Sequence, residues 1–227
     1  MSAELLGTLQ EVEAQAVECV RCALHAGRTQ VVFGEGNADA ELALVGEAPG
    51  FHEDREGRPF AGRAGELLER LLGAIGLGLD DVYLATVLKC RPPGNRDPLP
   101  DESAACEPYL YRQLELVSPR VVATLGSFAT ELLSGRALGI TRVHGIPQEV
   151  TLGGRAVVLY PLFHPAAALY TPSMLEILER DVSRLPALLA AGDGDAPAPS
   201  SRFSLGAEPP ERVPARETRQ PVQLGLF

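Results

Sequence analysis

The chain has no tryptophan, only four cysteines among 227 residues, and no long apolar run. A membrane helix needs about 20 mostly apolar residues, so we expect no membrane-spanning segment. The acidic, polar N-terminus does not resemble a secretory signal peptide, which predicts a cytoplasmic protein. In that reducing compartment the cysteines are not expected to form disulfides.

Positive charge is also scarce. Lys and Arg number 20 against 30 Asp and Glu, for a net charge of -10. Proteins that coat nucleic acid over a broad surface are basic, so this balance excludes that class and leaves room only for a local basic patch. The 45% of hydrophobic residues suffices for one sizeable core. We expect a folded domain over 1–191, and the Pro- and Ala-rich stretch 192–222 predicts a disordered linker.

Apolar runs and helical spacing alternate along the folded part. Strands are expected at 41–46, 81–90, 120–126 and 155–165, and helices at 3–20, 64–76, 101–117, 127–135 and 171–192, with Ser2 and Asp101 as N-caps. This alternation predicts a three-layer α/β/α fold around a mostly parallel four-stranded sheet. Ligands of such folds bind where the strands end, which points to the loops after Val45 and Leu88 and the loop containing His164.

The loop after the first strand reads GEAPGFHEDREGRPFAG, residues 46–62. Its glycines allow a ligand to approach the backbone closely, but it lacks the Gly-Lys-Ser/Thr ending of a phosphate loop. Its carboxylates, moreover, would repel phosphate. We expect Glu53, Asp54 and Glu56 to be solvated loop charges.

The cysteines suggest a metal centre. Cys19 and Cys22 form a C-x-x-C pair, whereas Cys90 and Cys106 flank a proline-rich loop. Four thiolates complete one tetrahedral metal site or one cubane cluster. Structural zinc sites usually combine two close pairs, so the distant second pair favours an iron–sulfur cluster. Zinc and plain buried thiols remain alternatives.

Several stretches in one order carry a family resemblance: GEAPGFHEDREGRPFAGRAGELL, LKCRPPGNRDPLPDESAACEPYL, VVATLGSFATELL, ITRVHG and FHPAAAL. Together, over about residues 15 to 190, they resemble the family 4 uracil-DNA glycosylases, monofunctional base-excision repair enzymes with a 4Fe–4S cluster. The resemblance implies hydrolysis of the N-glycosidic bond of uracil in single- and double-stranded DNA by a monomer. It also implies that Cys19, Cys22, Cys90 and Cys106 hold the cluster, in a structural role.

The resemblance also implies roles for single residues. Glu47, with Gly46 and Ala48, would form one wall of the uracil pocket and position the water. Phe60 would stack on the flipped base, and His164 would donate a hydrogen bond to uracil O2. Opposite charges develop on the sugar and on the leaving base, and a carboxylate and a donor suit them.

DNA contacts are implied as well, because an enzyme acting on a base must take it out of the stack. Arg91, Pro92 and Arg96 would contact the backbone, with Arg58 and Arg63 adding to a local patch. The segment around Ala167 to Leu169 would fill the gap left by the base. His144 stays open between packing and a phosphate or pocket contact.

The sequence departs from the family pattern at Thr86, where the family has Asn. An amide spans two atoms of the uracil edge, whereas one hydroxyl cannot. Losing a bidentate contact costs about 1–3 kcal/mol of discrimination. We expect Thr86 to be tolerated, with altered base choice as the alternative. LKCRPPGNRDPLP is the short form of a loop that carries a long basic insertion in covalent uracil-trapping relatives, which favours a turnover enzyme.

The chain ends in QLGLF, which resembles the peptide that docks on the bacterial β sliding clamp. We therefore predict a clamp-binding peptide over 223–227, with Gln223, Leu224, Leu226 and Phe227 as contacts. Its linker would raise the enzyme's concentration near DNA. The rival from another class is a non-catalytic iron–sulfur DNA-binding protein.

Overall fold

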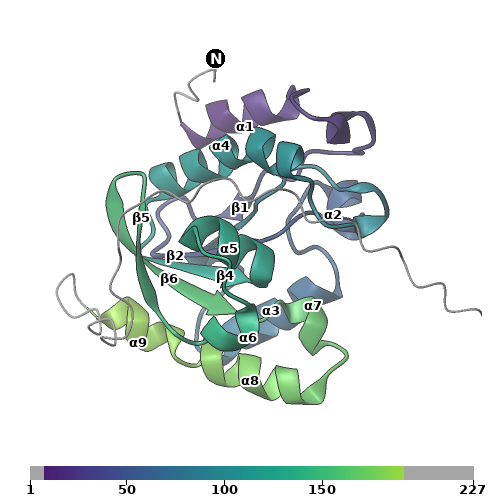
Figure 1. Cartoon of the computed structure of the whole chain (residues 1–227). Helices are drawn as coiled ribbons and strands as arrows, with labels where there is room; N and C mark the ends of the chain where they lie inside the picture. The colour runs from purple at the N-terminus through teal and green to yellow at the C-terminus, as the bar shows by residue number, and fades with distance from the viewer. Residues whose placement is uncertain (1–7, 192–227) are drawn as a thin grey trace, which may run out of the picture. The chain divides into compact units, whose positions relative to one another are not determined.

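A computed structural model describes residues 8–191, which build helices on both faces of one sheet (Figure 1). The strand order is β1-β3-β2-β4-β6-β5. The bounds are β1 (Glu35–Gly36), β2 (Leu42–Gly46), β3 (Val82–Thr86), β4 (Val121–Leu125), β5 (Gln148–Leu152) and β6 (Arg155–Leu162). The inner strands β3, β2, β4 and β6 pair in parallel, whereas β1 and β5 pair antiparallel at the edges.

The predicted α/β/α class is confirmed, and the four predicted strands are the four parallel ones. The predicted count of four was too low because two edge strands were missed. β1 has only two residues, and β5 is partly exposed along its length, so neither has the continuous apolar run that marks a buried strand.

Two apolar layers hold the helices to the sheet. One face packs against α3 (Arg63–Ala74), α7 (Pro165–Ala168), α8 (Pro172–Val182) and α9 (Leu185–Ala190). The other face packs against α4 (Pro100–Val117) and α5 (Ser127–Ser134). Alternate residues of each strand serve opposite faces, as strand geometry requires. A third cluster joins α1 (Leu9–Val17) to α4 and to the segment after β3.

Short helices complete the described part: α2 (Phe51–Glu56), α6 (Ile140–Val143), η1 (Ala23–Ala26), η2 (Leu79–Asp81) and η3 (Pro93–Asn95). α2 lies inside the glycine-rich loop and was not predicted. Within residues 8–191 no helix combines the length and apolar character needed to cross a membrane.

Three predicted helix boundaries differ from the structure. Helix α1 is capped by Thr8, and the predicted cap Ser2 lies outside the described residues. The prediction of Asp101 as N-cap was wrong, because α4 begins at Pro100 with Leu99 as its cap. The last helix was predicted as one piece but is divided into α8 and α9, because Pro186, in the first turn of α9, has no N–H to continue the ladder.

Candidate active site

The loop after β2 is anchored to the segment after β3. The carbonyl of Gly46 accepts a hydrogen bond from the Val87 amide at 2.9 Å, and that of Glu47 accepts one from the Leu88 amide at 3.0 Å. In the sheet itself Gly46 lies opposite Thr86. Glu47 therefore stands at the carboxyl ends of two neighbouring strands, as expected for a ligand-binding edge.

Phe60 adopts a strained backbone conformation at this edge. Its φ is +55°, a region that bulky residues rarely enter. A Cβ on Gly65 would lie 1.6 Å from the Phe60 carbonyl oxygen, and one on Gly46 would lie 2.9 Å from Cζ of the ring. A side chain on Gly65 would therefore collide with backbone, whereas one on Gly46 would force the end of the Phe60 ring to shift. Strain of this kind is kept where the surroundings over-determine it, commonly at functional sites.

His164 caps α7 with its own ring. The Ala166 amide donates to Nδ1 of His164 at 3.1 Å, so this nitrogen must offer a lone pair. In the neutral imidazole the proton then sits on Nε2. The ring centroid lies 6.4 Å from that of Phe60, with the planes tilted by 30°. The backbone thus fixes one tautomer of a histidine beside the strained phenylalanine.

Burial shifts the pKa of both predicted catalytic groups in the direction that favours the neutral form of each. Burial lowers the pKa of His164, an effect opposed by the Glu53 carboxylate. Burial raises the pKa of Glu47, and the charge of Asp97 raises it further. Perturbed groups of this kind are typical of functional sites.

Two of the loop carboxylates are structural, so the expectation that they are solvated charges was wrong for them. Glu53 accepts hydrogen bonds from the amides of Gly50 at 3.1 Å and Gly62 at 3.2 Å, which ties the two ends of the loop together. Asp54 is buried and accepts from the Thr29 amide at 2.9 Å. Glu56 is exposed as expected. Glu53 bonds back to the amide of the cap residue Gly50, as the glutamate of a capping box does, but Gly50 has no side chain to complete the box.

Thr86 has already used its only hydroxyl proton. Its side chain, in a residue 4% exposed, donates to the carbonyl of Leu88 at 2.7 Å. Nζ of the buried Lys89 in turn donates to the Thr86 carbonyl at 2.7 Å. A threonine hydroxyl has one proton and two lone pairs, so towards a ligand Thr86 can only accept.

Ala48 and Pro92 are less accessible than predicted. Ala48 packs against the cluster that contains the cysteines, and Pro92 is buried. In the segment after His164, Ala167 is exposed, whereas Leu169 packs against the core. Tyr170, which was not predicted, is 77% exposed, with the Arg63 guanidinium 5.9 Å from its ring centroid.

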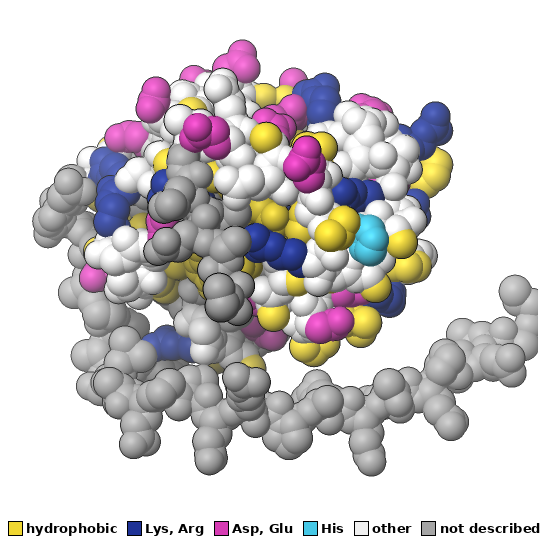
Figure 2. Space-filling view, turned by 90° about the horizontal axis from the view of Figure 1, so that it is seen from above, with side chains coloured by type: hydrophobic (Ala, Val, Ile, Leu, Met, Phe, Trp, Pro, Cys, Tyr) yellow, Lys and Arg dark blue, Asp and Glu magenta, His cyan; other side chains and the backbone are white. Residues whose placement is uncertain are grey.

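The arginines of the expected patch divide into two kinds. Arg58 pairs with both oxygens of Glu35, and Arg96 with both oxygens of Glu102. Arg91 and Arg63 instead lie over exposed aromatic rings. On the face shown in Figure 2, basic and acidic side chains are interspersed and no broad basic surface forms, which agrees with the net charge.

His144 is held by a buried acid. Its Nδ1 lies 2.6 Å from an oxygen of Asp181, and its ring packs 4.5 Å from that of Phe163, the neighbour of His164. Asp181 is 1% exposed. The structure thus gives His144 a packing role next to the site.

The four cysteines line one small cavity of about 20 Å³ between α1, η1, α4 and the end of β3. Burial raises the pKa of Cys22 and Cys90, and raises that of Cys106 to about 12. The Lys89 amide donates to Cys106 Sγ at 3.2 Å, and Arg28 donates to Cys90 Sγ at 3.5 Å. Within residues 8–191 no three His, Cys, Asp or Glu side chains are disposed to hold a single metal ion.

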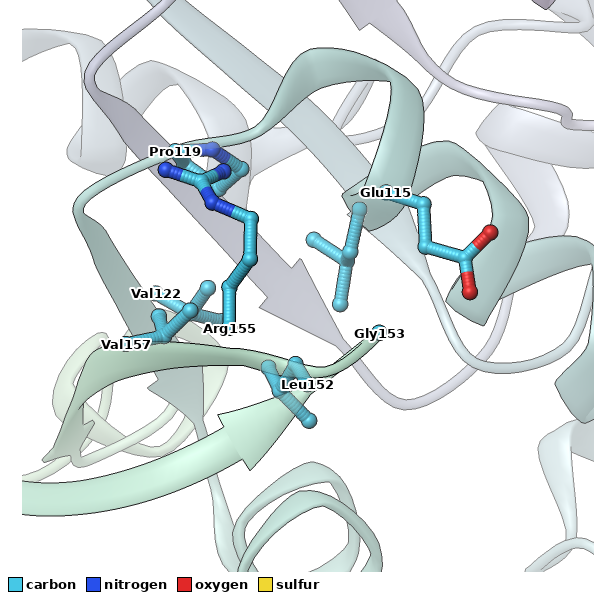
Figure 3. A pocket seen from close by; sticks show the side chains of 8 residues that line it. Glu115, Pro119, Val122, Leu152, Gly153, Arg155 and Val157 are labelled. Atoms are coloured by element: carbon cyan, nitrogen blue, oxygen red, sulfur yellow. The ribbon is translucent and has the colours of Figure 1, made fainter.

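A second cavity, of about 40 Å³, lies near the amino ends of β4 and β6, away from the candidate site (Figure 3). Leu114, Val122, Leu152, Arg155 and Val157 are among its lining residues. None of the sequence-predicted site residues lines this cavity. The predicted catalytic and stacking residues Glu47, Phe60 and His164 lie instead at the carboxyl ends of the strands.

Comparison with known proteins identifies the family. A family model described as the uracil DNA glycosylase superfamily matches residues 33–185, and the chain belongs to that superfamily. Within it the chain is similar to type-4 uracil-DNA glycosylases, as predicted. It is 47% identical to that of Thermotoga maritima, over 70% of this chain and 82% of that protein. It is 43% identical to that of Archaeoglobus fulgidus, over 78% and 92%, and 41% identical to that of Sulfurisphaera tokodaii, over 79% and 84%.

Proposed function

We propose that the protein is a monofunctional uracil-DNA glycosylase that hydrolyses the bond between uracil and deoxyribose. The observation that carries the proposal is the tautomer of His164. The Ala166 amide occupies Nδ1, which leaves Nε2–H as a fixed donor beside Phe60. A donor already oriented towards developing negative charge needs no reorganisation during the reaction.

The reaction uses the residues at the carboxyl edge in distinct ways. The flipped uracil stacks on Phe60. The C1′–N1 bond breaks with its electron pair going to the base, and His164 Nε2–H donates to O2, where negative charge develops. Glu47, ionised, offsets positive charge on the sugar, and it accepts a proton from the water that adds to C1′. The lowered pKa of His164 favours the neutral ring that this role needs, whereas burial, which raises the pKa of Glu47, opposes its ionised form.

Thr86 limits how well the base edge is read. Its hydroxyl donates its proton to the Leu88 carbonyl, so the side chain can accept from uracil N3–H but cannot donate to O4. An unmet polar contact costs about 1–3 kcal/mol. The second candidate function, a glycosylase with relaxed choice among deaminated bases, rests on this observation, because N1–H of hypoxanthine is also a donor.

We also propose a 4Fe–4S cluster in the cavity that the four cysteines line. Thiols buried among apolar side chains resist ionisation, and a bound metal centre stabilises the thiolates that it needs as ligands. The Lys89 amide, as a donor to sulfur, suits a thiolate ligand. When bound, the cluster would hold α1 and the loop around Pro92 to the sheet. Absorption near 400 nm, lost on treatment with an oxidant and chelator, tests for it against zinc.

Two further proposals concern DNA and the chain end. We propose a cytoplasmic monomer that acts on single- and double-stranded DNA. Tyr170 is more accessible than Leu169, so we propose that the Tyr170 side chain fills the gap left by the flipped base. The linker 192–222 and the clamp peptide 223–227 lie outside the described residues. Deletion of 223–227 should abolish co-elution with a β sliding clamp and leave excision from short oligonucleotides unchanged.

Base release from oligonucleotides tests the function. Each strand carries one uracil, hypoxanthine or xanthine, and abasic sites are revealed by alkaline cleavage. Wild-type protein should cleave at uracil, and Thr86→Asn should raise the preference for uracil over hypoxanthine about tenfold, because a bidentate amide contact is worth about 1–3 kcal/mol. Release of hypoxanthine alone would favour the second candidate. No release by cluster-loaded protein would contradict both.

A further inference from the structure

Phe51 is an exposed aromatic residue inside the loop that follows β2. It begins α2, one residue after Gly50, and is 47% exposed. A lone exposed apolar side chain is ordinary and needs no explanation. The surroundings of this ring, however, are not those of a chance exposure.

Charged and aromatic groups from two separate segments converge on the ring. The Arg55 guanidinium lies 5.6 Å from its centroid, and that of Arg91, from the loop after Cys90, lies 5.2 Å from it. The His52 ring meets it edge-on at 5.5 Å and 85°. Arg91 is itself oriented by a bond from its Nε to Asn95 Oδ1 at 2.7 Å. Phe51 is thus joined to both loops that border the candidate active site.

The guanidinium charges of Arg55 and Arg91 are not neutralised by carboxylates of the described residues. Within residues 8–191 neither Arg55 nor Arg91 forms an ion pair with a carboxylate. Arg58 and Arg96, close by in sequence, are neutralised by paired contacts with Glu35 and Glu102. In a protein of net charge -10, two unpaired guanidiniums beside an exposed ring form a local site for an anion with an apolar, planar part.

A nucleotide matches that description. Aromatic side chains stack on bases of single strands, and guanidiniums bind the adjoining phosphates. We propose that Phe51 is a stacking platform for an unpaired base next to the target nucleotide, with Arg55 and Arg91 on neighbouring phosphates. The inference rests on the proposed function for its DNA partner. In a duplex both faces of a base are covered by its neighbours, so the platform serves single-stranded DNA.

Affinity for labelled oligonucleotides, measured by fluorescence anisotropy with cluster-loaded full-length protein, tests the proposal. The single strands carry a 2′-fluorinated deoxyuridine, which resists excision. Phe51→Leu keeps apolar bulk without a ring, and Phe51→Tyr keeps the ring. Val17→Ala, at an exposed apolar position on α1, is the control.

Stacking predicts that Phe51→Leu weakens single-strand binding roughly tenfold, whereas Phe51→Tyr and Val17→Ala stay within about twofold. Duplex binding should not change. The salt dependence should also stay the same, because no phosphate contact is removed. An abasic residue at one position beside the target should weaken wild-type binding but not Phe51→Leu binding, since paired groups are not additive.

Three results would overturn the platform: Phe51→Leu binding like wild type, Phe51→Tyr losing as much as Phe51→Leu, or equal losses on single and double strands. Excision from ordinary uracil strands separates the two claims. Wild-type excision with any of these results refutes the platform alone. Absence of wild-type excision refutes the proposed function, and the comparison of oligonucleotide affinity between wild type and the Phe51 variants can still be interpreted.

Discussion

The two ends of the same parallel strands are built differently. At the amino ends, the apolar side chains of Leu114, Val122 and Val157 line a cavity of about 40 Å³ together with Glu115 and Arg155. At the carboxyl edge the chain keeps a strained Phe60, a desolvated Glu47 and a histidine whose tautomer is fixed. These features cost stability and are retained only where they serve another purpose. Substitutions at the carboxyl ends should therefore lower activity without lowering stability, and substitutions at the amino ends should lower stability without lowering activity.

His164→Ala should show the largest effect. It removes the proposed donor to O2, and loss of one such donor lowers kcat about 100- to 1,000-fold. The melting temperature should change little, because the partly exposed ring forms one local hydrogen bond. Single-turnover excision and thermal melting on the same preparation check both statements. A large drop in melting temperature with only a small kinetic loss would make His164 structural.

Glu47→Gln should lower activity and raise stability together. Loss of a general base costs about 100-fold or more. Because burial raises the pKa of Glu47 in the folded state, the folded protein binds this proton more readily than the unfolded chain does, and ionisation of Glu47 at neutral pH destabilises the fold. The variant should thus melt higher at pH 7. Its advantage should shrink as pH falls through the raised pKa and vanish below about 4.5, the ordinary glutamate value.

The acid side of the kinetic profile gives an independent check on Glu47. Activity of the wild-type enzyme should fall, as pH decreases, at a higher pH than an ordinary glutamate would give. A Glu47→Gln variant that melts lower than wild type at pH 7 would show that the carboxylate contributes to the fold.

Leu114→Ala should act in the opposite sense at the amino edge. Leu114 is 4% exposed and lines the existing cavity, so truncation enlarges an apolar void and destabilises by about 2–5 kcal/mol. Urea unfolding measures this loss, and kcat for uracil excision at a temperature where the variant is folded should match wild type. A kinetic defect in the folded variant would break the division between the two edges.

Much of the carboxyl edge could be predicted from sequence, because motif and topology agree there. The strands that end at Gly46, Thr86 and Leu162 contain buried apolar runs, so their carboxyl ends could be placed side by side. The role of Glu53 was missed because its two amide partners lie on either side of it in the loop. The ion pair between Arg96 and Glu102 was missed because an arginine in a proline-rich loop is expected to be exposed and unpaired. The hydrogen bond from the Ala166 amide depends on local backbone angles, which residue types do not specify.

The measurement that tests the central claim most directly is ¹⁵N NMR of the histidine rings across pH, with His164→Ala to assign the signal among four histidines. The account predicts that His164 at pH 7 is neutral, with the proton on Nε2 and an unprotonated Nδ1, and that it stays neutral below pH 6.5, the ordinary histidine pKa. A proton on Nδ1 at pH 7, in either the neutral or the charged ring, would contradict the account, because the Ala166 amide would then face a donor and Nε2–H would no longer be fixed as the hydrogen-bond donor to the leaving base.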